Sequence, residues 1–255
     1  MMLATRHLSV SIGDVTIVED MALRIEAGQC WGLIGRNGAG KTTLLNTLAG
    51  LRKPDSGHIE FHGQALSSIA RRRLATQLGL LQQHTVYVFD ATVLQTALIG
   101  RHPHLGPWQR ESAADFEQSR RALRAVDMER LESRRVTSLS GGEARRLAFA
   151  TLLVQDPTMM LLDEPTNHLD LHFQVRLMNL LTDLTRADGK AALAALHDVN
   201  LVSRYCSHVL CLFGDGGYAA GPARELLEPD LLSRLYQHEI SSVESGSGRQ
   251  FFPLR

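Results

Sequence analysis

The stretch "GRNGAGKTT", residues 35–43, is the strongest single indication of the fold in this chain. It follows the apolar run "CWGLIG" (30–35), typical of a short buried strand, and overlaps "KTTLLNTLAGL" (41–51), whose apolar spacing is typical of a helix. Glycines between a strand and a helix let backbone N–H groups turn inward and form a concave anion site, to which the helix N-terminus adds partial positive charge. The spacing fits the phosphate-loop pattern G-x-x-x-x-G-K-[ST], so the sequence predicts that this loop binds a nucleoside triphosphate.

Two side chains of this loop have distinct expected roles. Lys41 should reach the β- and γ-phosphates, and the Thr42 hydroxyl should ligate Mg²⁺. The motif by itself does not distinguish ATP from GTP. We expect the triphosphate to lie against Gly35, Arg36, Asn37, Gly38, Ala39, Gly40, Lys41, Thr42 and Thr43.

A second stretch, "MMLLDEP" (159–165), supplies acidic groups that hydrolysis of a γ-phosphate requires. Its four leading apolar residues predict a strand that is buried on both faces. Asp163 stands at the carboxyl end of that strand, where a parallel sheet places its ligand crevice, and it can hold Mg²⁺ opposite Thr42. Glu164 follows directly, points in a different direction and is free to polarise a water molecule. Two solvated acids at a strand end are the alternative, which the neighbouring phosphate loop disfavours.

The stretch "LSGGE" (139–143) admits two interpretations at the level of local chemistry. Ser140, Gly141 and Gly142 precede a predicted helix, and exposed N–H groups at a helix N-terminus can bind phosphate. Ser140 with Glu143 three residues later is also a capping box, in which the two side chains satisfy the first N–H groups of the helix. These residues alone do not decide between the two interpretations.

Strand and helix patterns alternate along most of the chain. Residues 3–26 alternate apolar and polar side chains between turn signals, which predicts an antiparallel β-subdomain at the start. Residues 66–78 have a helical pattern, and later apolar runs alternate with amphipathic stretches. We therefore expect a single α/β domain with a mostly parallel sheet, built from a phosphate-loop core (1–83 and 154–255) and an inserted α-helical subdomain (84–153).

Composition limits the classes of function. The chain has 255 residues with 27 basic and 27 acidic side chains, so net charge does not attract it to nucleic acid or to anionic lipid. Its three cysteines lack a paired C-x-x-C spacing, and we expect buried, reduced side chains. No apolar run approaches the roughly 20 residues that span a bilayer, and the first residues lack a secretory-signal pattern. We expect a cytoplasmic protein, or one held at a membrane through another polypeptide.

Four motifs, in their order and spacing, give the sequence its resemblance to a known family. They are "GRNGAGKTT" (35–43), "LSGGE" (139–143), "LLDEPTNHLD" (161–170) and "ALHD" (195–198). From about residue 3 to residue 225, the chain resembles the nucleotide-binding subunit of ATP-binding-cassette (ABC) transporters. Phosphate-loop GTPases, kinases and RecA-type recombinases have no "LSGGE" helix. The resemblance implies that the core is RecA-like and that the bound nucleotide and metal are ATP and Mg²⁺.

In that family, two subunits hold two ATP molecules between them, head to tail. The resemblance implies that Ser140, Gly141 and Gly142 of one copy face Lys41 and Thr42 of the other copy across the γ-phosphate. Each site is then complete only in a homodimer.

The resemblance also implies roles for other polar side chains. Glu164 is the expected general base, and Asp163 is an expected Mg²⁺ partner. His197 matches the switch histidine that contacts the γ-phosphate, and Asp170 matches the loop that links the two sites of the dimer. Gln83 matches the glutamine that senses Mg²⁺ and the attacking water. The residues after Gln83 should form the groove that receives a coupling helix of a membrane subunit.

Three positions deserve comparison with the family pattern. Ile12 stands where relatives usually stack adenine on an aromatic ring, and it offers apolar contact without stacking, which predicts weaker nucleotide affinity and base selectivity. Gln82 precedes Gln83 where proline is frequent in relatives, so both glutamines stay candidates for the sensing role. Ala144 replaces a glutamine that often follows "LSGGE", with no consequence that we can assign.

The segment 98–123 narrows the class of transporter. Its "GRHPH" stretch (100–104) is similar to importers of iron–siderophore complexes, haem and cobalamin. His102 and His104 are expected to pack in the helical lobe, because an ATPase in the cytoplasm does not touch the chelate.

The resemblance thus implies an ATPase that powers a bacterial metal-chelate importer from the cytoplasmic face of the inner membrane. Its expected partners are two permease subunits and a periplasmic binding protein, with no nucleic acid. An exporter ATPase of the same superfamily would share every catalytic residue and stays open. A soluble cassette ATPase that works on ribosomes or DNA repair is disfavoured by the single cassette. The sequence does not reveal which chelate is transported.

Overall fold

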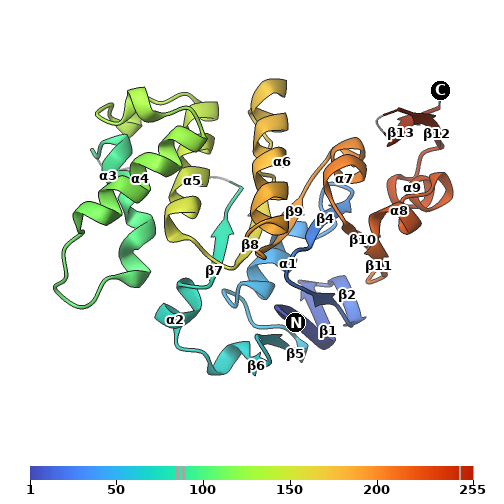
Figure 1. Cartoon of the computed structure of the whole chain (residues 1–255). Helices are drawn as coiled ribbons and strands as arrows, with labels where there is room; N and C mark the ends of the chain where they lie inside the picture. The colour runs from blue at the N-terminus through green and yellow to red at the C-terminus, as the bar shows by residue number, and fades with distance from the viewer. Residues whose placement is uncertain (84–86, 88–89, 247, 255) are drawn as a thin grey trace.

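The computed structural model describes residues 1–83, 87, 90–246 and 248–254. Within these residues a six-stranded sheet forms the centre, and a smaller antiparallel sheet lies beside the N-terminus (Figure 1). On the opposite side of the central sheet, three helices gather in a lobe: α3 (Val93–Leu98), α4 (Ala113–Ala125) and α5 (Gly141–Gln155). This arrangement confirms the predicted α/β class.

The central sheet is mostly parallel, as predicted. Only its edge strand β11 runs antiparallel to its neighbour β10 among the described strands. Every residue of the three inner strands β4, β9 and β8 is buried, which explains why their sequences are continuously apolar. The order across the sheet is β11 (Tyr218–Pro222), β10 (His208–Leu212), β4 (Cys30–Gly35), β9 (Ala191–Ala195), β8 (Met159–Asp163) and β7 (Leu78–Leu81).

The antiparallel sheet at the start of the chain is also as predicted. Its strands are β1 (Leu3–Ile12), β2 (Val15–Met21), β3 (Arg24–Ile25), β5 (Ser56–Phe61) and β6 (Gln64–Ala65).

The prediction of one helix over residues 66–78 was wrong. The chain forms a 3₁₀ turn, η1 (Leu66–Ser68), and a short helix, α2 (Arg71–Ala75). The backbone of Ile69 and Ala70 is extended between them, with ψ near 126° and 132°. Among the described residues, no side chain caps α2, and its first turn holds no acidic residue that would compensate the adjacent arginines.

The helical lobe is built from short, well-capped elements. Capping boxes at Thr92, Ser112 and Ser140 begin α3, α4 and α5. The predicted boundary of the helical subdomain near residue 84 lies outside the described residues, so the proposed division of the chain stays a prediction. The connecting 3₁₀ turns are η2 (Ile99–His104), η3 (Glu129–Leu131) and η4 (Val136–Ser138).

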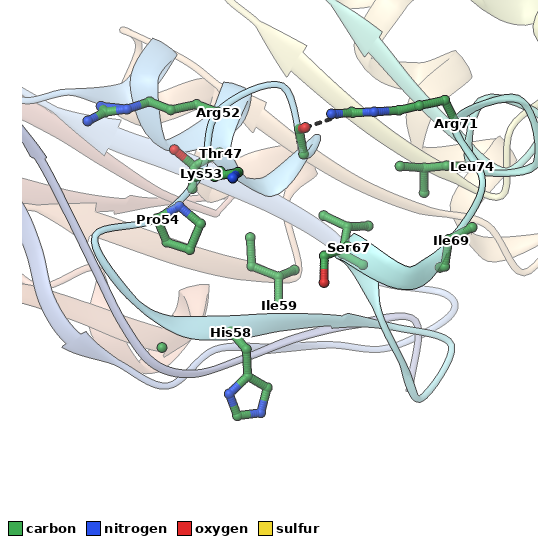
Figure 2. Close-up of a pocket in the computed structure, with 13 residues that line it drawn as sticks. Thr47, Arg52, Lys53, Pro54, His58, Ile59, Ser67, Ile69, Arg71 and Leu74 are labelled. Carbon is green, nitrogen blue, oxygen red and sulfur yellow. Dashed lines mark hydrogen bonds between the residues drawn. The ribbon is translucent and has the colours of Figure 1, made fainter.

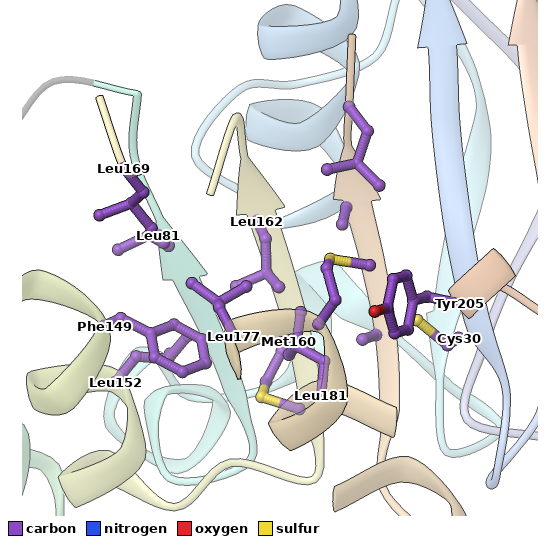
Figure 3. Close-up of a cluster of buried hydrophobic side chains, with 14 of the residues drawn as sticks. Cys30, Leu81, Phe149, Leu152, Met160, Leu162, Leu169, Leu177, Leu181 and Tyr205 are labelled. Atoms are coloured by element: carbon purple, nitrogen blue, oxygen red, sulfur yellow. The ribbon is translucent and has the colours of Figure 1, made fainter. Parts of the chain in front are cut away.

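A buried apolar cluster attaches the lobe to the sheet (Figure 3). Phe149 and Leu152 of α5 pack toward Leu81 of β7 and Leu162 of β8. The helix α6 (Leu171–Arg186) has the predicted bounds, and it buries Leu177, Met178 and Leu181 on the same cluster. The helix α5, which begins within the LSGGE stretch (139–143) and is called the signature helix below, is therefore held against the strands whose ends carry the predicted catalytic residues.

The last part of the chain packs against the core that contains the central sheet. After α7 (Val199–Tyr205), α8 (Ala223–Leu226) and α9 (Pro229–Tyr236), a hairpin forms from β12 (Ile240–Ser245) and β13 (Gly248–Pro253).

Two side chains fix this hairpin and α9 to the core. The side-chain amide of Asn200 in α7 donates to the carbonyl of Phe251 (3.1 Å) and accepts from its N–H (2.8 Å). Arg36 of the phosphate loop donates to Gln237 Oε1 (2.5 Å), just after α9.

The cysteines Cys30, Cys206 and Cys211 are free and buried, which agrees with the expected small apolar role. Among the described helices, none is both long and apolar enough to cross a membrane.

Candidate active site

The phosphate loop runs from the carboxyl end of β4 into α1 (Lys41–Leu48). Gly38 and Gly40 have φ of 81° and 90°, a left-handed backbone that glycine adopts without strain. A Cβ on Gly40 would also lie 2.5 Å from Ile17 Cγ1. Among the described residues no side chain caps the start of α1, and its first turn holds no acid. The first N–H groups of α1 are therefore open to an anion.

Lys41 is 6% exposed and lies within the loop. Its Nζ donates to the carbonyl oxygens of Gly35 (2.9 Å) and Arg36 (3.2 Å). Burial lowers the pKa of Lys41, and the negative charges of Glu164 and Asp163 oppose this change only in part. A phosphate group in the loop would supply the missing counter-charge.

Glu164 is the centre of a cluster of hydrogen bonds just after β8. Its backbone has a φ of 51°, a strained value for a residue other than glycine, and this turns the side chain out of the strand. Its Oε1 lies 2.7 Å from His197 Nε2, and its Oε2 accepts from Gln83 Nε2 at 2.8 Å and from Asn167 Nδ2. These residues approach the carboxylate from three separate segments of the chain.

The protonation state of Glu164 follows from two opposed effects. Burial raises the pKa of its carboxyl group, but the hydrogen bonds from His197 and Gln83 and the charges of His197 and Lys41 lower it, and the net pKa lies below the usual value. The group is therefore an ionised carboxylate at neutral pH. An oriented carboxylate beside a phosphate loop can accept a proton from water.

Asp163 offers a different chemistry from its neighbour. It is 3% exposed, and its Oδ1 has no hydrogen-bond partner among the described residues. Burial raises the pKa of Asp163, whereas a hydrogen bond from Thr42 lowers it. A buried carboxylate oxygen without a partner is unfavourable unless a ligand satisfies it. Because Mg²⁺ prefers oxygen ligands, Asp163 and the Thr42 hydroxyl fit this metal, and Gln83 lines the same cavity as Thr42.

Lys41, Thr42 and the Glu164 cluster open onto one cavity of about 600 Å³, whereas Asp163 is not among its lining residues. Six of the predicted phosphate-loop residues, the three predicted catalytic residues and Ile12 meet there, and Ile12 is 51% exposed at the rim. Gly35 and Arg36 contribute carbonyl groups behind Lys41, and Ala39 is buried below the loop. The cavity is lined by Ile12, Asn37, Gly38, Gly40, Lys41, Thr42, Thr43, Gln83, Glu164, Asn167 and His197.

The signature residues lie outside this cavity. None of Ser140, Gly141 and Gly142 lines it, and the capping box of α5 is formed: Glu143 N–H donates to Ser140 Oγ (3.3 Å), and Ser140 N–H donates to Glu143 Oε2 (2.7 Å). Asp170 likewise caps α6 by accepting from the Phe173 N–H at 2.9 Å. The local capping interpretation therefore holds within one copy of the chain.

The two candidate glutamines have separate surroundings. Gln83 reaches the cavity and Glu164, whereas Gln82 lines a groove on the other side of the junction between sheet and lobe. Sequence reasoning did not single out Asn167, although it lies three residues after Glu164 in the quoted "LLDEPTNHLD" motif. It also overlooked Arg145, for which local sequence carried no signal.

The groove that Gln82 lines has a volume of about 370 Å³ and lies between β7, α3 and α5. Its apolar wall includes Leu51 and Ile99, which are 59% and 49% exposed, and Tyr87 lies on it as well. The predicted coupling groove was placed on the residues after Gln83, of which 84–86 and 88–89 lie outside the described residues, so that placement stays a prediction.

A further cavity of about 430 Å³ lies beyond the C-terminal end of α1 (Figure 2). Ile59, Leu74 and Ile69 line it, and Arg71 lies at its edge with a hydrogen bond to the Gly50 carbonyl (2.6 Å). This cavity shares no lining residue with the one around Lys41.

Comparison with known proteins agrees with this geometry. The sequence profile of the family described as "ABC transporter" matches residues 18–167, more than half of the chain. The chain belongs to the ABC transporter family. This ABC ATPase binds and hydrolyses ATP.

Its relatives include transport subunits with named cargo. The ferric enterobactin transport ATP-binding protein FepC of Escherichia coli is 36% identical over 90% of this chain and 85% of the relative. The hemin import ATP-binding protein HmuV of Rhodopseudomonas palustris is 35% identical over 98% of this chain and 95% of the relative. A solved structure assigned to a metal-chelate type ABC transporter, in an inward-facing conformation, is 25% identical with a TM-score of 0.86, covering 100% of this chain and 98% of that chain.

Proposed function

We propose that this ABC ATPase powers a bacterial importer of metal chelates, of the iron–siderophore, haem or cobalamin class. The observation that carries the catalytic part is the ionised Glu164 carboxylate, held by Gln83, Asn167 and His197 at a cavity whose opposite wall is the phosphate loop. The cargo class is supported by the ferric enterobactin and hemin import relatives.

In this proposal the loop binds the triphosphate through its N–H groups, the helix N-terminus and Lys41. Lys41 moves from the loop carbonyls to the β- and γ-phosphates, whose charge compensates its burial. Thr42, Asp163 and Gln83 would hold Mg²⁺, which neutralises charge on the phosphate oxygens when bound. Ile12 provides apolar contact to the base at the rim of the cavity.

Glu164 acts as the general base in this mechanism. It takes a proton from the water that attacks the γ-phosphate, and its low pKa keeps the carboxylate ready to do so. The Gln83 side-chain amide donates a hydrogen bond to Oε2 of the same carboxylate, so Gln83 lies where it can orient that water. The His197 side chain is 40% exposed and lies in the cavity wall, which lets it donate to the γ-phosphate.

We further propose a head-to-tail homodimer, because the signature residues of one copy do not line its own nucleotide cavity. Ser140, Gly141 and Gly142 of the second copy would close the cavity, and Asp170 would lie at the contact between the two sites. A mixed dimer tests this geometry. Ser140→Arg in one copy should block closure of the site formed with the other copy's Lys41, and a mixed dimer with unaltered ATP turnover would refute the shared site.

The apolar groove lined by Leu51, Gln82 and Ile99 is the proposed seat of a permease coupling helix. The subunit then works at the cytoplasmic face of the inner membrane, with two permease subunits and a periplasmic binding protein. An exporter ATPase is the alternative, and the import relatives favour the first reading.

One experiment tests both direction and cargo. The subunit is purified with its permeases and binding protein, reconstituted in vesicles, and assayed for ATP hydrolysis with ferric siderophores, haem or cobalamin. We expect one chelate class to stimulate hydrolysis and to accumulate with the polarity of import. Stimulation by none of the three classes would refute the proposed cargo.

A further inference from the structure

Arg145 lies where α5 meets the carboxyl ends of β7 and β8, the two strands that precede Gln83 and Glu164 and are called the catalytic strands below. It lies in the early part of α5 and is 5% exposed. Its Nη1 donates to the carbonyl groups of Gln82 and, at 3.2 Å, Gln83, just after β7. Its Nη2 donates to the carbonyl groups of Asp163 and, at 2.8 Å, Glu164, at the end of β8. One guanidinium group thus joins three segments that are far apart in the sequence.

This arrangement differs from an ordinary structural ion pair. Each Nη of Arg145 is bonded to main-chain oxygens, and its Nε has no partner among the described residues. Because these bonds involve the backbone, they control where the chain leaves each strand, and therefore where the side chains of Gln83 and Glu164 start. The planar, multi-donor guanidinium suits this geometry better than the point charge of a lysine.

The same junction separates the groove from the nucleotide cavity. Gln82 lines the groove and Gln83 lines the cavity, and Arg145 holds the carbonyl groups of both. The hydroxyl of Tyr87, which also lines the groove, contacts the Ala144 carbonyl next to Arg145 at 3.4 Å. A rotation of α5 against the sheet would therefore strain the bonds that position both catalytic side chains.

We propose that Arg145 is a positioning residue that ties the orientation of the signature helix to the placement of Glu164 and Gln83. Hydrolysis is then fast only when the helical lobe has the orientation in which all four carbonyl groups are engaged. This inference rests on the proposed catalytic roles of Glu164 and Gln83, and it assigns to Arg145 the link between lobe movement and chemistry.

The test compares three variants of the subunit assembled with its permeases. Arg145→Gln removes the charge and most donors, Arg145→Lys keeps the charge with poorer geometry, and Arg101→Gln is the control. Arg101 is another mostly buried arginine of the lobe, which binds Asp115 (2.7 Å) and the Val154 carbonyl (3.3 Å) and touches neither catalytic strand. Its loss should destabilise the lobe without disturbing the junction.

We expect kcat to fall about 10- to 100-fold in Arg145→Gln, because small misplacements of catalytic groups cost rates of this order. The Arg145→Lys variant should be intermediate, and KM for ATP should change by less than about threefold in both, because Arg145 does not line the nucleotide cavity. Arg101→Gln should keep the kcat of the unaltered subunit even if its melting temperature falls as much as that of Arg145→Gln.

A second measurement separates this inference from the proposed function. Amide hydrogen exchange of the isolated subunit should rise around residues 82–83 and 163–164 in Arg145→Gln, and around α4 in Arg101→Gln. Unchanged exchange at the junction, or a kcat that falls only in proportion to stability in both Arg145→Gln and Arg101→Gln, would overturn the positioning role. If instead Glu164→Gln hydrolyses ATP normally while junction exchange responds as expected, the assignment of the base fails and the link made by Arg145 stands.

Discussion

Replacing Glu164 by glutamine should stop turnover while leaving the fold and ATP binding intact. The structure indicates how the amide would fit. Its oxygen can take the place of Oε2, which accepts from Gln83 and Asn167, and its NH₂ group can face His197 Nε2 at the position of Oε1. In the neutral tautomer that carries its proton on Nδ1, Nε2 can accept a hydrogen bond from this NH₂ group.

The expected magnitudes follow from what is lost. The charge-assisted bonds become neutral ones, but the cost of burying a carboxylate disappears too, so the free energy of unfolding should change by less than about 1 kcal/mol. The general base is removed entirely, which should lower kcat by about 10²- to 10⁴-fold, or about 3–5 kcal/mol in activation free energy.

The assay is steady-state phosphate release at saturating ATP, with thermal unfolding and ATP-driven dimerisation measured on the same samples. Glu132→Gln is the matched control, because Glu132 pairs with Arg120 at the surface of the lobe, 3.0 Å away, and has no contact with the cavity. A Glu164→Gln subunit that releases phosphate within about threefold of the unaltered rate would remove Glu164 from the base role.

Three further perturbations probe the loop, the lobe and the groove. Gly40→Ala places a Cβ 2.5 Å from Ile17 in a left-handed backbone, so we expect a loss of about 1–3 kcal/mol in unfolding free energy and weakened ATP binding; unaltered binding in a nucleotide titration would contradict this. Hydrogen bonds from Ser112 lower the pKa of Asp115 to about 2 from the usual 3.8, so this carboxylate stabilises the fold above pH 3.8 and loses that effect as the pH falls toward 2. Asp115→Asn should therefore cost on the order of 1 kcal/mol at pH 7, and the difference from the unaltered chain in denaturant unfolding should shrink below pH 4, whereas a constant difference would refute the linkage. Leu51→Asp, at a side chain that is 59% exposed, should keep basal ATP hydrolysis and abolish its stimulation by the permeases, and full stimulation would exclude Leu51 from the coupling contact.

Local patterns predicted the parts of this molecule that depend on neighbouring residues. The phosphate loop, the buried strand before Asp163 and the amphipathic helix 171–186 were all visible as short-range periodicity or spacing. The failed helix over 66–78 shows the limit of that approach, because apolar spacing there did not report the missing caps and the extended residues between η1 and α2.

The unpredicted parts of the site depend on contacts between distant segments. Asn167 reaches Glu164 only because the strained backbone after β8 turns back on itself. Arg145 meets carbonyl groups that are about 20 and 60 positions away along the chain, and no local period encodes such a meeting. The same reasoning explains why the choice between Gln82 and Gln83 needed the structure: adjacent residues after a strand point to opposite sides, and only packing decides which side holds the cavity.

The hydrogen bonds of Asn200 and Arg36 make the C-terminal residues a structural part of the ATP-binding unit. The family profile matches only as far as residue 167, yet the partners of these two side chains, Phe251 and Gln237, come some 70 to 85 positions later. Truncation of the chain after α9, or fusion of a bulky reporter to the final hairpin, would therefore disturb α7, which follows His197, and the phosphate loop. The ATP affinity of such a shortened protein would therefore differ from that of the full chain.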